Sequence, residues 1–175
     1  MLSRRTLQEI LGYMIGGSVF LVLLPYGLFR ASVHLDPLIP VQLIPYSALR
    51  FIISIILFVV GLLFGIWSNI ILYAKGKGGP VQFANVEISP KTQNLVETGP
   101  YRYTRNPMLF GACMFYYAVA IYLNSIIAFL LVTLFMTFML ILVKLIEEPR
   151  LRGDFGSEYE KYRRKVSMFI PWPRK

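Results

Sequence analysis

The sequence predicts an all-α fold: a polytopic membrane protein with four transmembrane helices, the last two forming a helical hairpin, and a short C-terminal interfacial helix. Composition is the first indication. Hydrophobic residues make up 56% of the 175 residues and charged residues 15%, whereas a soluble domain is roughly 45–50% apolar and about 25% charged. The second is patterning, because the apolar residues gather into four long runs of uncharged sequence, each about as long as a membrane span.

The four predicted spans are residues 10–29, 51–73, 107–123 and 126–146. Backbone polar groups must be paired inside a bilayer, so each span is expected to be a helix. Arg4 and Arg5 precede the first span as they would a signal peptide. Its apolar run is long for one, however, and no small-residue cleavage site follows, so we expect a retained helix. Only Asn124 and Ser125 separate the last two spans, which indicates antiparallel neighbours.

The basic residues orient this bundle. Four spans place both termini, the loop 74–106 and the tail 147–175 on one side, and of the 18 Lys and Arg residues only Arg30 and Arg50 lie on the other. The positive-inside rule then predicts an integral membrane protein with both termini cytosolic, in the plasma (or inner) membrane or the endoplasmic reticulum. We expect one domain over residues 1–175. Contact with anionic membrane lipids accounts for the net charge of +9 without nucleic acid.

Several classes of site are excluded by what the chain lacks. Its one cysteine, Cys113, rules out an internal disulfide, and its one histidine, His34, rules out a histidine cluster for a metal. The spans carry no charged residue at mid-membrane, where pumps and ion-coupled transporters usually need one. We therefore predict neither metal binding nor ion-coupled transport.

The polar residues that could bind a ligand or take part in catalysis lie on the predicted cytosolic side. Asn106 and Pro107 have the residue types of a helix N-cap and first turn, and a helix N-terminus beside Arg105 suits a carboxylate or phosphate. Glu147 and Glu148 end the fourth span, where an inward carboxylate could bind an ammonium or lie near a sulfonium. Taken alone, the same residues also fit plain capping and a charge pair with Lys144.

The tail predicts a further short helix. Phe155, Tyr159, Tyr162 and Val166 recur at helical spacing, and Ser157 and Glu160 have the spacing of a capping box. We interpret this segment as an interfacial helix that covers the cytosolic mouth of the bundle.

These motifs occur in an order that resembles one family. The segment Gly99-Pro100-Tyr101-Arg102-Tyr103-Thr104-Arg105-Asn106-Pro107-Met108, a helical hairpin, Glu147-Glu148-Pro149 and Phe155-Gly156-Ser157-Glu158-Tyr159 resembles the integral-membrane isoprenylcysteine carboxyl methyltransferases and phospholipid methyltransferases. The resemblance implies S-adenosylmethionine as cofactor. It implies that Arg105, Glu147 and Glu148 are catalytic. It also implies a cofactor site made by Tyr101, Arg105, Asn106, Pro107 and Glu147.

Two positions depart from the family pattern. Asn106 stands where the family usually has a histidine, and Leu109 where it usually has a tyrosine. An asparagine can form hydrogen bonds but cannot act as a base near neutral pH.

The sequence therefore predicts methyl transfer from S-adenosylmethionine to a lipid-like amphiphilic acceptor that enters from the bilayer, either an isoprenylcysteine carboxylate or a phospholipid amine. Two alternatives remain open at this point. One is a nicotinamide-dependent membrane reductase on a related scaffold, although the chain has no dinucleotide fingerprint. The other is a non-catalytic membrane adaptor whose basic face binds anionic lipid.

Overall fold

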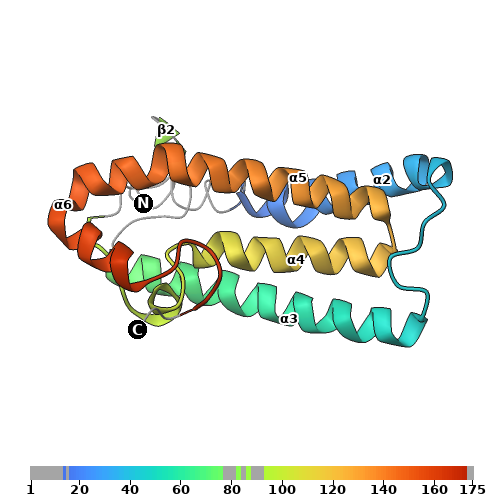
Figure 1. Cartoon of the computed structure of the whole chain (residues 1–175), viewed down its shortest axis with the longest axis horizontal. Coiled ribbons are helices and arrows are strands. Elements are labelled where there is room, and N and C mark those ends of the chain that lie inside the picture. The colour runs from blue at the N-terminus through green and yellow to red at the C-terminus, as the bar shows by residue number, and fades with distance from the viewer. Residues whose placement is uncertain (1–13, 15, 77–81, 84–85, 88–92, 173–175) are drawn as a thin grey trace, which may run out of the picture.

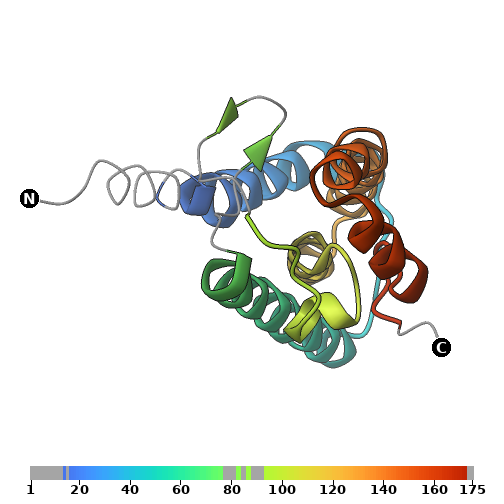
Figure 2. The same cartoon turned by 90° about the vertical axis from the view of Figure 1, so that its left-hand side faces the viewer.

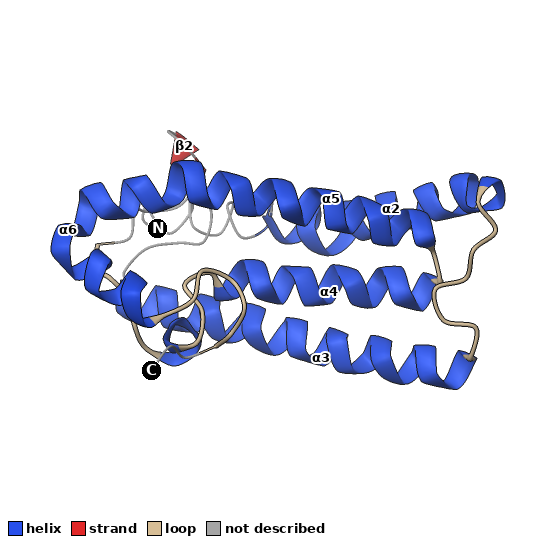
Figure 3. Cartoon of the chain, viewed as in Figure 1, coloured by secondary structure: helices blue, strands red, loops and turns tan. Residues whose placement is uncertain are grey.

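Four helices run side by side along the long axis of the molecule (Figure 1). The computed structural model describes residues 14, 16–76, 82–83, 86–87 and 93–172, and these are almost entirely helical (Figure 3). The long helices are α2 (Leu24–Leu35), α3 (Ser47–Ile71), α4 (Pro107–Leu123) and α5 (Ile126–Leu142). A fifth helix, α6 (Glu148–Lys165), folds over one end of the bundle.

The remaining elements are short. Three π-helical turns extend the long helices: η1 (Val19–Leu23), η3 (Leu72–Gly76) and η5 (Val143–Glu147). Two are 3-10 turns, η2 (Asp36–Leu38) and η4 (Gly99–Arg102). The strands β1 (Gln82–Phe83) and β2 (Val86–Glu87) form a small antiparallel pair.

The bundle has two distinct ends. The basic end carries η3, η4 and α6, with most of the Lys and Arg residues that the structure describes. The opposite end carries the segment 36–46 and the turn between α4 and α5 (Figure 1). Two hydrogen bonds join these last two pieces: Ile44 N–H donates to Asn124 Oδ1 at 3.0 Å, and Ile127 N–H donates to Asp36 Oδ1 at 3.3 Å.

Within the described residues, three continuous helical stretches are long and apolar enough to cross a membrane: Gly16–Leu38, Ser47–Gly76 and Ile126–Lys165. Large apolar side chains such as Leu63 and Leu134 remain exposed on their outer faces, as contact with lipid requires. The chain is thus helical and membrane-spanning, as predicted. The start of the first predicted span, residues 10–13, lies outside the described part of the chain.

The fourth span stays a prediction. α4 has 17 residues, which at 1.5 Å per residue is about 25 Å, less than the hydrocarbon thickness of roughly 30 Å. Viewed end-on, α4 lies at the centre with α2, α3 and α5 around it (Figure 2). Its position inside the bundle explains why so short a helix is accommodated.

The helix that contains the fourth predicted span continues past it, because α5 runs through η5 into α6. The wider π turn makes this possible: the Glu148 N–H donates to the carbonyl of Val143, five residues earlier. Pro149 then falls in the first turn of α6, where its missing N–H is not needed.

The α4–α5 hairpin is built as the sequence predicts. Asn124 adopts a left-handed conformation with φ 54°, which suits its short polar side chain. Ser125 then caps α5 by accepting a hydrogen bond from the Ala128 N–H at 2.8 Å. Between the two helices lies a core made of Cys113, Tyr116, Ala120, Ala128, Val132 and Met136.

α3 and α4 approach so closely that their backbones touch through glycines. A Cβ atom built on Gly111 would lie 2.7 Å from the Gly65 nitrogen, and one built on Gly61 would lie 2.7 Å from the Phe115 nitrogen. Small residues permit such contacts between membrane helices. The contact fixes the position of α4, and therefore of the candidate site at its first residue.

Candidate active site

The segment that leads into α4 is anchored at the basic end. Gly99 begins η4 with φ +63°, a conformation that glycine adopts without strain. Thr104 is completely buried. Its hydroxyl donates to the Met168 carbonyl at 3.2 Å and accepts from the Asn106 N–H at 3.2 Å.

Asn106 and Pro107 occupy the predicted N-cap and first position of α4. The Asn106 side chain, however, does not cap the helix. Its Nδ2 donates instead to the Met168 carbonyl at 2.9 Å. The predicted capping role of this side chain is therefore wrong, because the tail of the protein supplies a competing acceptor.

That tail forms what we call the C-terminal strap, residues 166–172, which runs along residues 103–106. The Arg105 N–H donates to the Ser167 carbonyl at 3.0 Å, and the Trp172 N–H donates to the Tyr103 carbonyl at 3.1 Å. Phe169 packs its ring against Phe110 of α4, with centroids 5.8 Å apart. The strap thereby fixes the backbone on both sides of Arg105.

The side chain of Arg105 lies in a buried ion pair with Glu148 of α6, and each side chain is only 8% exposed. Arg105 also donates from Nη1 to the hydroxyl of Tyr159 at 3.1 Å. The second carboxylate oxygen of Glu148 lies 3.6 Å from Nε of Arg163. Two of the predicted site residues, far apart in the sequence, therefore meet in space.

Two buried atoms of this cluster have no hydrogen-bond partner among the described residues: Nε of Arg105 and Oε1 of Glu148. The second of these makes the ion pair with Arg105 but accepts no hydrogen bond. A buried polar atom without a partner costs about 1–3 kcal/mol. Arg105 Nε is therefore an open buried donor, which suits a negatively charged group of a ligand.

Glu147 takes a different position from its neighbour. Its side chain is 43% exposed on the surface of the isolated chain and lies 3.5 Å from Arg150, an i,i+3 partner. Desolvation raises the pKa of the Glu147 carboxyl above its ordinary value, Arg150 opposes the shift, and the charge of Glu148 adds to it.

Tyr101 lies close enough to Glu147 for the two to interact electrostatically. Burial raises the pKa of the Tyr101 phenol, and the charge of Glu147 raises it further. The backbone carbonyl of Tyr101 accepts a 2.6 Å hydrogen bond from the Tyr162 hydroxyl. All six predicted residues therefore gather at the basic end, although only Arg105 and Glu148 are in direct contact.

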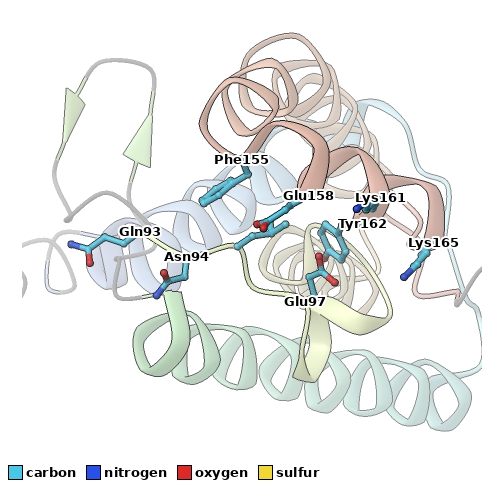
Figure 4. Close-up of a pocket in the computed structure, with 9 residues that line it drawn as sticks. Gln93, Asn94, Glu97, Phe155, Glu158, Lys161, Tyr162 and Lys165 are labelled. Carbon is cyan, nitrogen blue, oxygen red and sulfur yellow. The ribbon is translucent and has the colours of Figure 1, made fainter.

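A pocket of about 480 Å³ opens beside this cluster, between residues 93–97 and α6 (Figure 4). None of the six predicted residues lines it. Its walls include Asn94 and Glu97 on one side and Phe155, Glu158 and Tyr162 on the other. Tyr162 links the pocket to the cluster, because its ring packs against that of Tyr159, the tyrosine that accepts a hydrogen bond from Arg105, with centroids 6.3 Å apart.

A model of the phospholipid methyltransferase family matches residues 49–158, well over half of the chain. The chain belongs to the phospholipid methyltransferase family. This confirms the resemblance drawn from residues 99–108 and 147–159, and it assigns the protein to the membrane methyltransferases.

One curated relative also matches. The methanethiol S-methyltransferase 1 of Bradyrhizobium diazoefficiens is 34% identical to this family member over 74 residues, which is 42% of this chain and 25% of the relative. The chain thus matches about a quarter of the length of that relative. No solved structure matches the chain.

The sequence did not predict polar roles for three residues of this candidate site: Tyr159, Tyr162 and Arg163. Helical spacing did place Tyr159 and Tyr162 on one face, and the structure buries both in a cluster with Val166. The hydroxyl groups on that apolar face were the available signal, because a buried tyrosine hydroxyl usually has a partner. The part of the chain that the structure describes has no cluster of potential metal ligands.

Proposed function

We propose that this family member transfers the methyl group of S-adenosylmethionine to a lipid-like amphiphilic acceptor at the basic end of the bundle. The observation that carries the proposal is the buried donor Arg105 Nε, which has no partner among the described residues, beside the buried carboxylate of Glu148. The amino-acid end of the cofactor has a carboxylate for the first and an ammonium for the second. The N-terminus of α4, which starts at Pro107, adds a favourable field for the carboxylate.

S-adenosylmethionine supplies a methyl group that is already activated for direct displacement, so the protein needs mainly to align the reactants and exclude water. Arg105 and Glu148 suit the alignment, since both are nearly buried and held by α6. In this proposal Asn106 and Pro107 hold the start of α4 in place, and Tyr101 provides a neutral phenol beside Glu147.

For the acceptor we propose an isoprenylcysteine carboxylate or a phospholipid amine. The apolar outer faces of α2, α3 and α5 would let its lipid tail approach from the bilayer. A carboxylate needs no base, whereas an amine must lose a proton. Glu147, with its raised pKa, is the residue we assign to accept that proton, because Asn106 cannot.

A thiol is the second candidate acceptor, and the matching methanethiol S-methyltransferase favours it. A thiol must also lose its proton before it attacks a methyl group. Glu147 would accept the proton of the thiol, as it would that of an amine.

We also propose that the chain forms one membrane domain over residues 1–175, with α4 as the fourth span and both termini cytosolic. The gathering of described basic residues at one end supports this orientation. Membrane lipids would then surround the bundle and contribute anionic headgroups at that end.

Binding of S-adenosylmethionine to the purified protein in detergent tests the proposal, with nicotinamide cofactors as controls. We expect saturable binding of S-adenosylmethionine alone, weakened about 10- to 100-fold in Arg105→Gln, because a hydrogen bond to a charged group is worth about 1.5–3 kcal/mol. Arg102→Gln is the matched control, since Arg102 is exposed on η4. A folded wild type without saturable binding, or an Arg105→Gln variant that binds normally, would overturn the proposal.

The acceptor is then identified with a labelled methyl group. Three substrates are compared: a farnesylated cysteine derivative, phosphatidylethanolamine vesicles and methanethiol. Labelling of the farnesylated cysteine derivative or of phosphatidylethanolamine supports the lipid-like acceptor. Labelling of methanethiol alone would identify a thiol as the acceptor instead.

A further inference from the structure

A row of ion pairs leads from the candidate site to the protein surface. Glu148, which pairs with Arg105, lies 3.6 Å from Arg163; Arg163 lies 3.6 Å from Glu160, and Glu160 lies 2.6 Å from Arg152. The exposed fraction of the basic side chains rises along this row, from 8% at Arg105 to 41% at Arg163 and 51% at Arg152. The row therefore connects buried charges to solvent-exposed ones.

This row also joins the two halves of α6. Gly156 interrupts the helix with φ 53° and ψ −124°, so that residues 157–165 turn back toward the bundle (Figure 1). Glu148 and Arg152 precede this break, and their partners Arg163 and Glu160 follow it. The ion pairs thus act across the turn, where helical hydrogen bonds cannot.

The two carboxylate oxygens of Glu148 face two different arginines. Oε1 contacts Arg105, and Oε2 faces Arg163. An arginine and a carboxylate that meet alone often pair through two parallel hydrogen bonds. Such pairing would bring Glu148 Oε2 onto a second nitrogen of Arg105, such as the Nε that the structure leaves without a partner.

We propose that Arg163 is a positioning residue: by facing the second oxygen of Glu148, it prevents a two-point pairing with Arg105 and keeps Arg105 Nε open to the methyl donor. This inference rests on the proposed function, because it assigns Arg105 Nε to the carboxylate of S-adenosylmethionine. Arg163 itself contacts neither the donor nor the acceptor in this arrangement.

A positioning role and a merely structural role of Arg163 predict different effects when the residue is replaced. Loss of Arg163 lets Arg105 and Glu148 satisfy each other, so the protein should stay folded while the donor binds less well. Loss of a structural contact would instead lower the thermal stability and the turnover together. The discriminating quantities are therefore the KM for S-adenosylmethionine, kcat and the melting temperature.

The test compares Arg163→Met with Arg164→Met, a matched control one residue along α6. Arg164 is exposed and has no ion pair within the described residues. We expect the KM for S-adenosylmethionine to rise about 1.5- to fivefold in Arg163→Met, the range set by a half-exposed ion pair, with kcat nearly unchanged. Arg164→Met should resemble the wild type, and Arg163→Lys should recover most of the lost affinity.

Salt supplies a second readout. Raising the ionic strength to about 0.5 M screens partly exposed charges, so the wild-type KM should rise toward that of Arg163→Met, which should itself respond less. An unchanged KM in Arg163→Met, or a fall in melting temperature and kcat at constant KM, would overturn the positioning role alone. A wild type that binds no S-adenosylmethionine would overturn the proposed function as well.

Discussion

Replacing Gly111 with alanine should separate α3 from α4 and disturb the site at the start of α4. The new Cβ would lie 2.7 Å from the Gly65 nitrogen and 2.8 Å from the Gly61 carbonyl oxygen. Both are backbone atoms and cannot rotate away. Because ordinary contact begins near 3.4 Å, the helices must part by about 0.7 Å, a gap that forfeits a quarter to a half of the dispersion energy between the atoms concerned.

We therefore expect Gly111→Ala to lower the free energy of unfolding by about 1–3 kcal/mol, the usual cost of overpacking. Thermal unfolding in detergent measures this loss, and S-adenosylmethionine binding reports the movement of Arg105. Gly61→Ala should behave alike, since its Cβ would lie 2.7 Å from a backbone nitrogen. Gly65→Ala is the matched control on α3, where a Cβ meets nothing within 4 Å. Equal stability of Gly61→Ala and Gly65→Ala would refute the reasoning.

Three further predictions concern the basic end. Thr104→Val should cost about 1–3 kcal/mol in thermal unfolding, because two buried hydrogen-bond partners lose the hydroxyl, whereas Thr104→Ser should be milder. Tyr162→Phe should cost about 1 kcal/mol through its lost bond to the Tyr101 carbonyl, unless that carbonyl finds water. Methyl transfer to an amine or thiol should fall as the pH drops through the raised pKa of Glu147, because the protonated carboxyl cannot accept a proton; a pH–rate profile unchanged in Glu147→Gln would contradict this role.

The helices could be predicted well wherever one strong signal dominates. Uncharged runs located the spans, and Asn124-Ser125 located the hairpin. The helix that contains the first predicted span extends beyond Phe29, where that uncharged run ends. The helix continues to Leu35, and Arg30 is accommodated by Tyr26 and His34, each four residues away on the same face.

The members of the site could be predicted, but their pairing could not. Arg105 and Glu148 both belong to recognisable motifs, yet the one partner that sequence spacing offers the glutamates is Lys144, three and four residues away. The actual partner of Glu148 depends on the turn at Gly156, which brings Tyr159 and Arg163 back toward the start of α4. Such a turn is decided by long-range contacts that no local pattern contains.

The charges of the cluster link donor binding to the folding of α6. Arg105 and Glu148 are the buried charges of the cluster and neutralise each other, whereas Arg163 is partly exposed and also pairs with Glu160. The carboxylate of a bound donor would accept a hydrogen bond from the open Nε of Arg105. Because α6 and the strap hold Arg105, a ligand that binds only this arrangement must stabilise it. We therefore expect saturating S-adenosylmethionine to raise the melting temperature of the wild type and to do so far less in Arg105→Gln; an equal rise in both would place the donor elsewhere.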